Sequence, residues 1–156
     1  MIGNDIVDLS QAAKESNWKR TGYLEKLFTM AERFLIHVAK DPEAMVWLLW
    51  TMKESAYKAH TKDTKIRTFA PSLICCNNVI VHPTSATGNV SYMGHLYYTQ
   101  STLSETYIHT IAGEKTGILK RLKLKISDYD ESDSAYRNSN PASVSHHGKY
   151  LALIYL

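Results

Sequence analysis

Apolar and polar positions follow different patterns in the two parts of the chain. Residues 1–9 carry apolar side chains around Asp5 and are predicted to form a strand. From residue 29 to about residue 61, apolar positions recur every three or four residues, which is the spacing of one helix face. Beyond residue 61, short runs rich in Tyr, Val, Ile and Thr predict strands at 69–81, 89–99, 105–112, 118–126 and 144–156.

Three helix starts are marked by residues that favour helix N-termini. Ser10 is expected to cap a short helix that runs to about residue 18. Thr29 and Glu32 form a capping-box pattern, which is followed at helical spacing by apolar Phe34, Leu35 and Val38. The pair Asp41-Pro42 combines an N-cap residue with proline at the first helical position. The helix after it has an apolar face made of Met45, Leu48, Leu49, Met52, Ala56 and Ala59.

The order of these elements predicts the fold class. Helices come first and strands afterwards, without βαβ alternation, which is typical of an α+β protein with an antiparallel sheet. Residues 1–156 are expected to form a single domain. Its polar stretch at about 127–142 is expected to be a long loop.

Composition and charge narrow the class of protein. The chain is 44% hydrophobic and 21% charged, as ordinary globular proteins are, and no apolar run reaches the ~20 residues of a membrane span. Only two cysteines occur, side by side, and the first residues do not resemble a signal peptide, so we expect a cytoplasmic protein. A net charge of +3 without a dense basic stripe fits an acidic protein partner or a polyphosphate better than nucleic acid.

Two carboxylates are the main candidates for chemistry. Asp5 interrupts a strand that otherwise has a buried pattern, and buried carboxylates are rare unless they are paired or bind a metal. Glu54 lies on the long helix with Lys53 beside it and Lys58 four residues on. Together the carboxylates form a possible Mg²⁺ site, and the lysines suggest a phosphate ester as substrate. The alternative for Glu54 and Lys58 is a solvated ion pair on a helix surface.

Other polar positions have simpler interpretations. Asp8 is expected to have a structural role at a helix N-terminus, and His109 is expected to be an ordinary strand residue. The segment at 143–148 combines two serines, two histidines and a glycine, which can bind an anion but also suit a plain turn.

Four segments, taken in order, resemble the 4′-phosphopantetheinyl transferase superfamily. The first is Gly3-Asn4-Asp5-Ile6-Val7-Asp8-Leu9, and the second is Phe28-Thr29-Met30-Ala31-Glu32. The third is Trp50-Thr51-Met52-Lys53-Glu54-Ser55-Ala56-Tyr57-Lys58, and the fourth is Ser143-Val144-Ser145-His146 before the last strand. Their order resembles the short holo-acyl-carrier-protein synthase type, in which each active site lies between neighbouring subunits of a homo-oligomer. The chain from about residue 67 to residue 139 carries no motif of the family.

The resemblance implies an activity and a set of site residues. The reaction is transfer of the 4′-phosphopantetheine arm of coenzyme A to a serine of an acyl or peptidyl carrier protein, with release of adenosine 3′,5′-bisphosphate. Asp5 and Glu54 would hold Mg²⁺, and Glu54 or a metal-bound water would take the proton of the serine. The residues that would bind coenzyme A are Lys53, Lys58, Ser145 and His146.

The sequence also departs from the family at two positions. Val7 stands where two-half members have a second acidic ligand, so two carboxylates plus water are expected at the metal. Pro141 replaces the His or Asn that often precedes the last-strand motif. The alternative function is an inactive relative that binds a carrier protein or coenzyme A.

Overall fold

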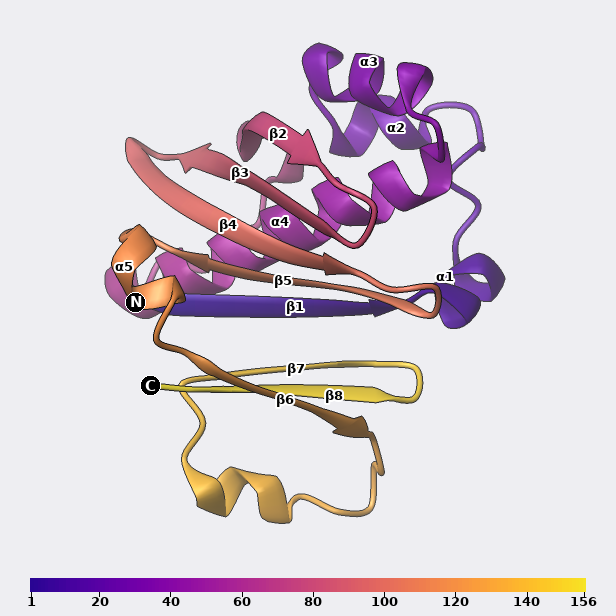
Figure 1. Cartoon of the computed structure of the whole chain (residues 1–156). Coiled ribbons are helices and arrows are strands. Elements are labelled where there is room, and N and C mark those ends of the chain that lie inside the picture. The colour runs from indigo at the N-terminus through magenta and orange to yellow at the C-terminus, as the bar shows by residue number, and fades with distance from the viewer.

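The computed structural model describes residues 1–156 and contains helices, short 3-10 turns and two antiparallel sheets (Figure 1). The α-helices are α1 (Leu9–Glu15), α2 (Tyr23–Leu27), α3 (Met30–Val38), α4 (Pro42–Thr64) and α5 (Thr116–Leu119), and the 3-10 turns are η1 (Pro71–Leu73) and η2 (Ala135–Ser139). The strands are β1 (Ile2–Asp8), β2 (Cys75–Val81), β3 (Ser85–Tyr92), β4 (His95–Leu103), β5 (Tyr107–Gly113), β6 (Lys123–Asp128), β7 (Ser143–His147) and β8 (Tyr150–Tyr155). The predicted α+β class with antiparallel sheets is confirmed.

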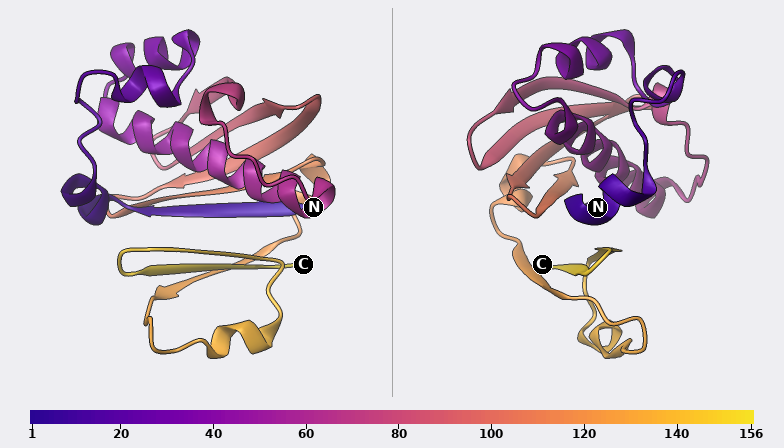
Figure 2. Two further views of the ribbon diagram at one scale, coloured as in Figure 1. Left: turned by 180° about the vertical axis from the view of Figure 1, so that it is seen from behind. Right: turned by 90° about the vertical axis from the view of Figure 1, so that its right-hand side faces the viewer.

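The larger sheet wraps around helix α4. Its strand order is β1-β5-β4-β3-β2, and every pair is antiparallel. Figure 2 shows the sheet curving around α4, which lies against one face. The main core fills this interface, where Leu49, Val90 and Tyr97 have no exposed surface. None of the helices is both long enough and apolar enough to cross a bilayer.

The smaller sheet has the order β6-β8-β7 and lies beside the outer edge of β1 (Figures 1 and 2). A small apolar cluster joins the two sheets, with Ile2 and Ile111 from the large sheet, Ile154 from β8 and Leu119 from α5. The loop 129–142 closes the far side of the small sheet and contains η2. Strand β7 therefore lies next to β1 although the two are separated by 134 residues along the sequence from Leu9 to Ala142.

Two predicted strands are hairpins in the structure. The run 89–99 spans the turn between β3 and β4, where Met93 and Gly94 have φ values of 48° and 78°. The run 144–156 includes the turn at Gly148, whose φ is 54°. Such left-handed conformations suit two-residue hairpin turns. The apolar and aromatic residues on both sides obscured these turns in the sequence pattern.

Other boundaries were also predicted incorrectly. The run 69–81 contains η1 before β2 begins at Cys75, and the run 118–126 begins in α5 before β6. Ser10 is not the cap of α1. Asp8 is, because its side chain accepts hydrogen bonds from the backbone N–H groups of Ser10 and Gln11.

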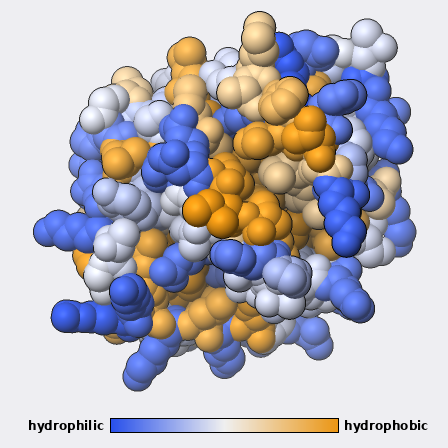
Figure 3. Space-filling view, turned by 45° about the horizontal axis from the view of Figure 1, so that its top comes forward, coloured by the Kyte–Doolittle hydropathy of each residue, from blue (hydrophilic) through white to orange (hydrophobic).

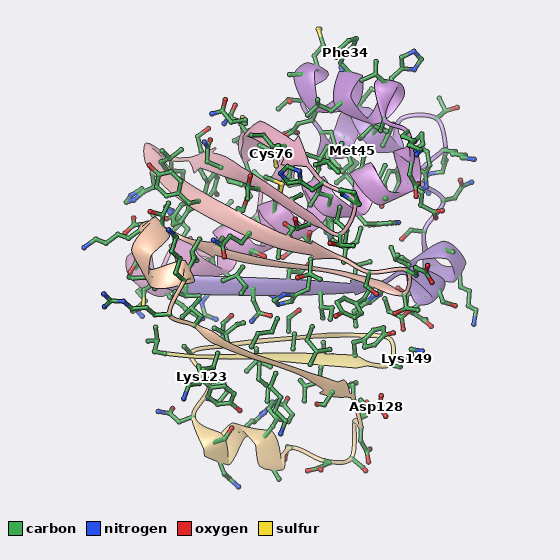
Figure 4. The ribbon with its side chains drawn as sticks, in the orientation of Figure 1. Phe34, Met45, Cys76, Lys123, Asp128 and Lys149 are labelled. Atoms are coloured by element: carbon green, nitrogen blue, oxygen red, sulfur yellow. The ribbon has the colours of Figure 1, made fainter.

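Helix α3 has the predicted capping box, but several of its apolar residues face solvent and a polar residue faces the core. The side chains of Thr29 and Glu32 cap each other's backbone N–H groups. Glu32 is fully buried, whereas Met30 and Phe34 are 78% and 63% exposed. Figure 4 places Phe34 on the outer side of α3, and Figure 3 shows apolar side chains gathered at this end of the molecule.

Candidate active site

The site begins with Gly3, which sets the distance between β1 and α4. A Cβ atom at this position would overlap the backbone oxygen of Ser55 and lie 2.7 Å from the backbone nitrogen of Ala59. Only glycine therefore allows α4 to pack this closely on β1. The close approach brings Lys58 of α4 to the edge of β1, where its Nζ donates to the backbone oxygen of Asn4 at 2.9 Å.

Asp5 lies two residues after Gly3 and is largely buried. Its Oδ1 atom accepts hydrogen bonds from Lys58 Nζ at 3.1 Å and from Ser145 Oγ at 3.0 Å. Its Oδ2 atom accepts no hydrogen bond from the chain. Burial raises the pKa of Asp5 above its ordinary value, although Lys58, the Ser145 hydroxyl and His147 act in the opposite direction.

Glu54 lies one helical turn before Lys58 on α4. It forms no ion pair and accepts no hydrogen bond within the chain. Burial and the nearby charge of Asp5 raise the pKa of Glu54 to about 7, and Lys58 only partly offsets them. The charge of Asp5 therefore acts on Glu54, while Lys58 forms its ion pair with Asp5.

An open cleft of about 300 Å³ contains both carboxylates. Its walls come from β1, α1, α2, α4 and β7 and from the residue that follows α1. One wall is aromatic, with Tyr23, Trp47 and Trp50, and Glu54 lines the same cleft. The full lining is Asp5, Ile6, Val7, Ala12, Glu15, Ser16, Tyr23, Trp47, Trp50, Glu54, His146 and His147.

The last-strand motif meets this cleft in two different ways. His146 lines the cleft, and its ring stacks on Tyr129 with centroids 4.1 Å apart. Ser145 is only 4% exposed, and its hydroxyl contacts Asp5 and the backbone N–H of Ile6. His146 is therefore available to a ligand. The hydroxyl of Ser145, by contrast, accepts from the backbone N–H of Ile6 and donates to Asp5 within the protein.

Lys53 does not lie at the cleft, which corrects the expectation that it binds coenzyme A. Its side chain is fully buried and its Nζ lies 2.7 Å from Glu32 Oε1. The same ammonium group donates to the backbone oxygens of Leu27 and Pro71. Adjacent residues of a helix point about 100° apart. Lys53 therefore ties α4 to α3 and η1, while Glu54 faces the cleft.

Asp8 and His109 have structural roles. Burial opposes ionisation of Asp8, yet the backbone N–H groups of Lys149, Gln11 and Ser10 keep its pKa below the ordinary value. His109 lies in β5, is 1% exposed, and contacts Asn4 Oδ1 at 3.1 Å through its Nε2 atom. Burial, together with the charge of Lys58, lowers the pKa of His109 to about 4, so it is neutral at pH 7.

The sequence interpretation missed several wall residues of the cleft. Glu15, Ser16 and Tyr23 come from the region around α1 and α2, where no motif marks them. His147 was predicted only as part of a segment that can bind an anion or form a turn; in the structure its Nε2 contacts Glu15 Oε2 at 2.9 Å. Alternation along β7 places residues 143, 145 and 147 on one side of the strand, which could have indicated the contact of His147 with β1 but not its place in the cleft wall.

A divalent cation fits the chemistry of Asp5 and Glu54. No cluster of three or more His, Cys, Asp or Glu side chains is placed to hold a metal. Two carboxylates with raised pKa values, one with a free oxygen, are nevertheless suitable ligands for a hard cation that takes its other ligands from water or phosphate.

Comparisons with known proteins concern the family and the fold of the chain. A model of the 4′-phosphopantetheinyl transferase superfamily matches residues 1–112. No curated protein sequence matches the chain. Among solved structures, the chain is similar to holo-[acyl-carrier-protein] synthase from Thermotoga maritima, with a TM-score of 0.50 and 12% identity over 99% of this chain and 83% of that one. At this identity the structural similarity concerns the fold, whereas the family match covers more than two thirds of the sequence. The chain therefore belongs to the 4′-phosphopantetheinyl transferase superfamily.

Proposed function

We propose that this protein transfers the 4′-phosphopantetheine arm of coenzyme A to a serine of an acyl or peptidyl carrier protein. The observation that carries the proposal is the pair of carboxylates, Asp5 and Glu54, in one cleft with Lys58 beside them. Family membership supports phosphopantetheinyl transfer in general. The Mg²⁺ dependence, the use of coenzyme A and the release of adenosine 3′,5′-bisphosphate are parts of the proposal.

Asp5 and Glu54 are the proposed metal ligands. When bound there, Mg²⁺ would supply positive charge to the diphosphate of coenzyme A and to the phosphate group that leaves. The free Oδ2 atom of Asp5 and the unpaired carboxylate of Glu54 support this assignment.

Lys58 is the proposed phosphate ligand. Its ammonium group has three donors, of which two are directed to Asn4 and Asp5, and its side chain is 31% exposed. The third donor is free to bind a phosphate oxygen of coenzyme A. His146 at the cleft wall is a second candidate contact for the nucleotide part.

Glu54 is the proposed general base. The serine oxygen of the carrier protein attacks the phosphorus atom that bears the pantetheine arm, and the serine proton passes to Glu54. The bond from this phosphorus to the bridging diphosphate oxygen breaks, and adenosine 3′,5′-bisphosphate leaves with the electron pair. Glu54 suits this role because its carboxylate lies in the cleft and has no hydrogen-bond or ion-pair partner in the chain.

We further propose a homo-oligomer in which a neighbouring subunit completes each active site. A volume of about 300 Å³ is at the lower end of the range for small-ligand pockets, and coenzyme A is a large ligand.

We also propose that residues 1–156 form one catalytic domain. We propose a cytoplasmic location as well, which the two free cysteines support.

The test combines purified protein, Mg²⁺, coenzyme A and an apo carrier protein, and measures the intact mass of the carrier. We expect a mass increase of one phosphopantetheine group, which is lost in Glu54→Gln and in the presence of EDTA. Carrier binding without any mass increase, in the wild type and in Glu54→Gln alike, would instead support the inactive relative.

A further inference from the structure

Side chains of β7 form hydrogen bonds with the backbone at the facing edge of β1. The backbone N–H groups of Asn4, Ile6 and Asp8 point toward β7, because alternate residues of a strand direct their N–H groups to the same side. They donate to Ser143 Oγ at 3.0 Å, Ser145 Oγ at 3.1 Å and His147 Nδ1 at 2.9 Å, respectively. No backbone ladder joins β1 and β7. We call these three contacts the β1–β7 seam.

Within the seam, Ser145 is the residue that also touches a carboxylate of the candidate site. A hydroxyl group has one proton to donate and can accept at the same time. Ser145 accepts from Ile6 and donates to Asp5 Oδ1 at 3.0 Å. Ser143 accepts from the backbone N–H of Asn4 in the same way and forms no hydrogen bond with Asp5.

The position of Ser145 makes it unsuited to bind a ligand directly. Ser145 is 4% exposed and does not line the cleft, whereas Asp5 and His146 do. The Ser145 hydroxyl and Lys58 Nζ donate to the same oxygen of Asp5, Oδ1. The two contacts fix the rotation of the carboxylate and leave Oδ2 without a partner in the chain.

We infer that Ser145 is a positioning residue that orients Asp5 for a divalent cation, and that it does not bind coenzyme A. This inference rests on the proposed function, because it assumes that Asp5 is a metal ligand. It gives the C-terminal hairpin β7–β8 a role in the site, since β7 holds the Asp5 carboxylate in place across the seam. Hydrogen bonds of this kind to metal-binding carboxylates typically change metal affinity by about 10- to 100-fold.

The test compares Ser145→Ala with Ser143→Ala, because each variant removes one hydroxyl from the seam and only Ser145→Ala removes a contact to Asp5. Mn²⁺ binding to the protein alone is measured by electron paramagnetic resonance, and the stability of each variant by thermal unfolding. We expect Ser145→Ala to bind Mn²⁺ at least about tenfold more weakly than the wild type and Ser143→Ala to stay within about twofold. Coenzyme A affinity in EDTA should be the same for all three proteins.

The outcomes separate this inference from the proposed function. Equal Mn²⁺ affinity of the two variants, with a wild type that binds Mn²⁺, overturns the inference and leaves the transferase proposal in place. Weaker coenzyme A binding by Ser145→Ala in EDTA also overturns it, because that result means direct contact with the ligand. A wild type that binds no Mn²⁺ overturns both.

Discussion

Replacing Glu54 by glutamine should remove activity and yet stabilise the fold at alkaline pH. In the folded protein, burial and Asp5 raise the pKa of Glu54 from 4.5 to about 7. One pKa unit corresponds to 1.36 kcal/mol, so the ionised carboxylate costs the folded state about 3 kcal/mol, and about 2 kcal/mol once solvent screening is allowed for. This is a substantial part of the 5–15 kcal/mol that stabilises typical domains.

The sign of the pH dependence follows from the proton balance. Below pH 4.5 Glu54 is protonated in both the folded and the unfolded state, and the wild type and Glu54→Gln should have similar stability. As the pH rises from 4.5 to about 7, the unfolded chain releases the proton first, so the wild type loses stability and the glutamine variant does not. Above pH 7 the full difference of about 2 kcal/mol should be present.

Urea unfolding at pH 4.5 and pH 8.5, in EDTA and followed by tryptophan fluorescence, measures this difference. Glu131→Gln is the control, because Glu131 is exposed in the loop after β6. Addition of Mg²⁺ at pH 8.5 should stabilise the wild type more than Glu54→Gln. Equal stability of Glu54→Gln and the wild type at pH 8.5 would show that the ionised carboxylate of Glu54 does not destabilise the folded state.

Four further substitutions test the site and its support. Asp5→Asn should abolish transfer while far-ultraviolet circular dichroism stays unchanged, and unfolding of this variant would mean a structural role instead. Lys58→Met should raise KM for coenzyme A by about tenfold, whereas Lys53→Met should leave that KM unchanged and lower the free energy of unfolding by about 3–5 kcal/mol, because it breaks a buried ion pair. Gly3→Ala should unfold the protein or shift its Tm strongly downward, since the new methyl group overlaps the backbone of Ser55. A Tm within a few degrees of the wild type would refute the close approach of β1 and α4.

Lys53 and Lys58 show that a sequence motif does not determine which of its residues face the site. Both lysines belong to the same segment, and the resemblance to the family assigned both of them to coenzyme A. In the structure, Lys58 contacts Asp5, whereas Lys53 is fully buried against Glu32. Which side of α4 is covered depends on α2, α3 and η1, whose contacts with Lys53 no local sequence pattern encodes.

In helix α3, too, the side that is buried differs from the side that the sequence pattern indicated. Its apolar spacing indicated that Phe34 and Val38 face the core, yet these residues are 63% and 56% exposed, while Glu32 is fully buried. The side chain of Glu32 accepts from Thr29, Lys53 and the backbone N–H of Cys76. These three contacts satisfy the buried carboxylate, so the polar side of the helix can face inward.

The sequence by itself determined the elements whose cause is local. The strand around Asp5, the capping box at Thr29, the start of α4 at Asp41-Pro42 and the α+β class all follow from spacing and capping chemistry. The segments that resemble the family also pointed to Asp5, Glu54 and Lys58.

Only the tertiary structure decided which side chains meet. Ser145 lies 140 residues from Asp5 along the chain, and their contact exists because the small sheet brings β7 beside β1. Burial raises the pKa of Asp5, and burial together with the charge of Asp5 raises the pKa of Glu54; both effects depend on the spatial arrangement of β1 and α4. Local patterns carry secondary structure, whereas burial and charge at the site are properties of chain segments that meet only after folding.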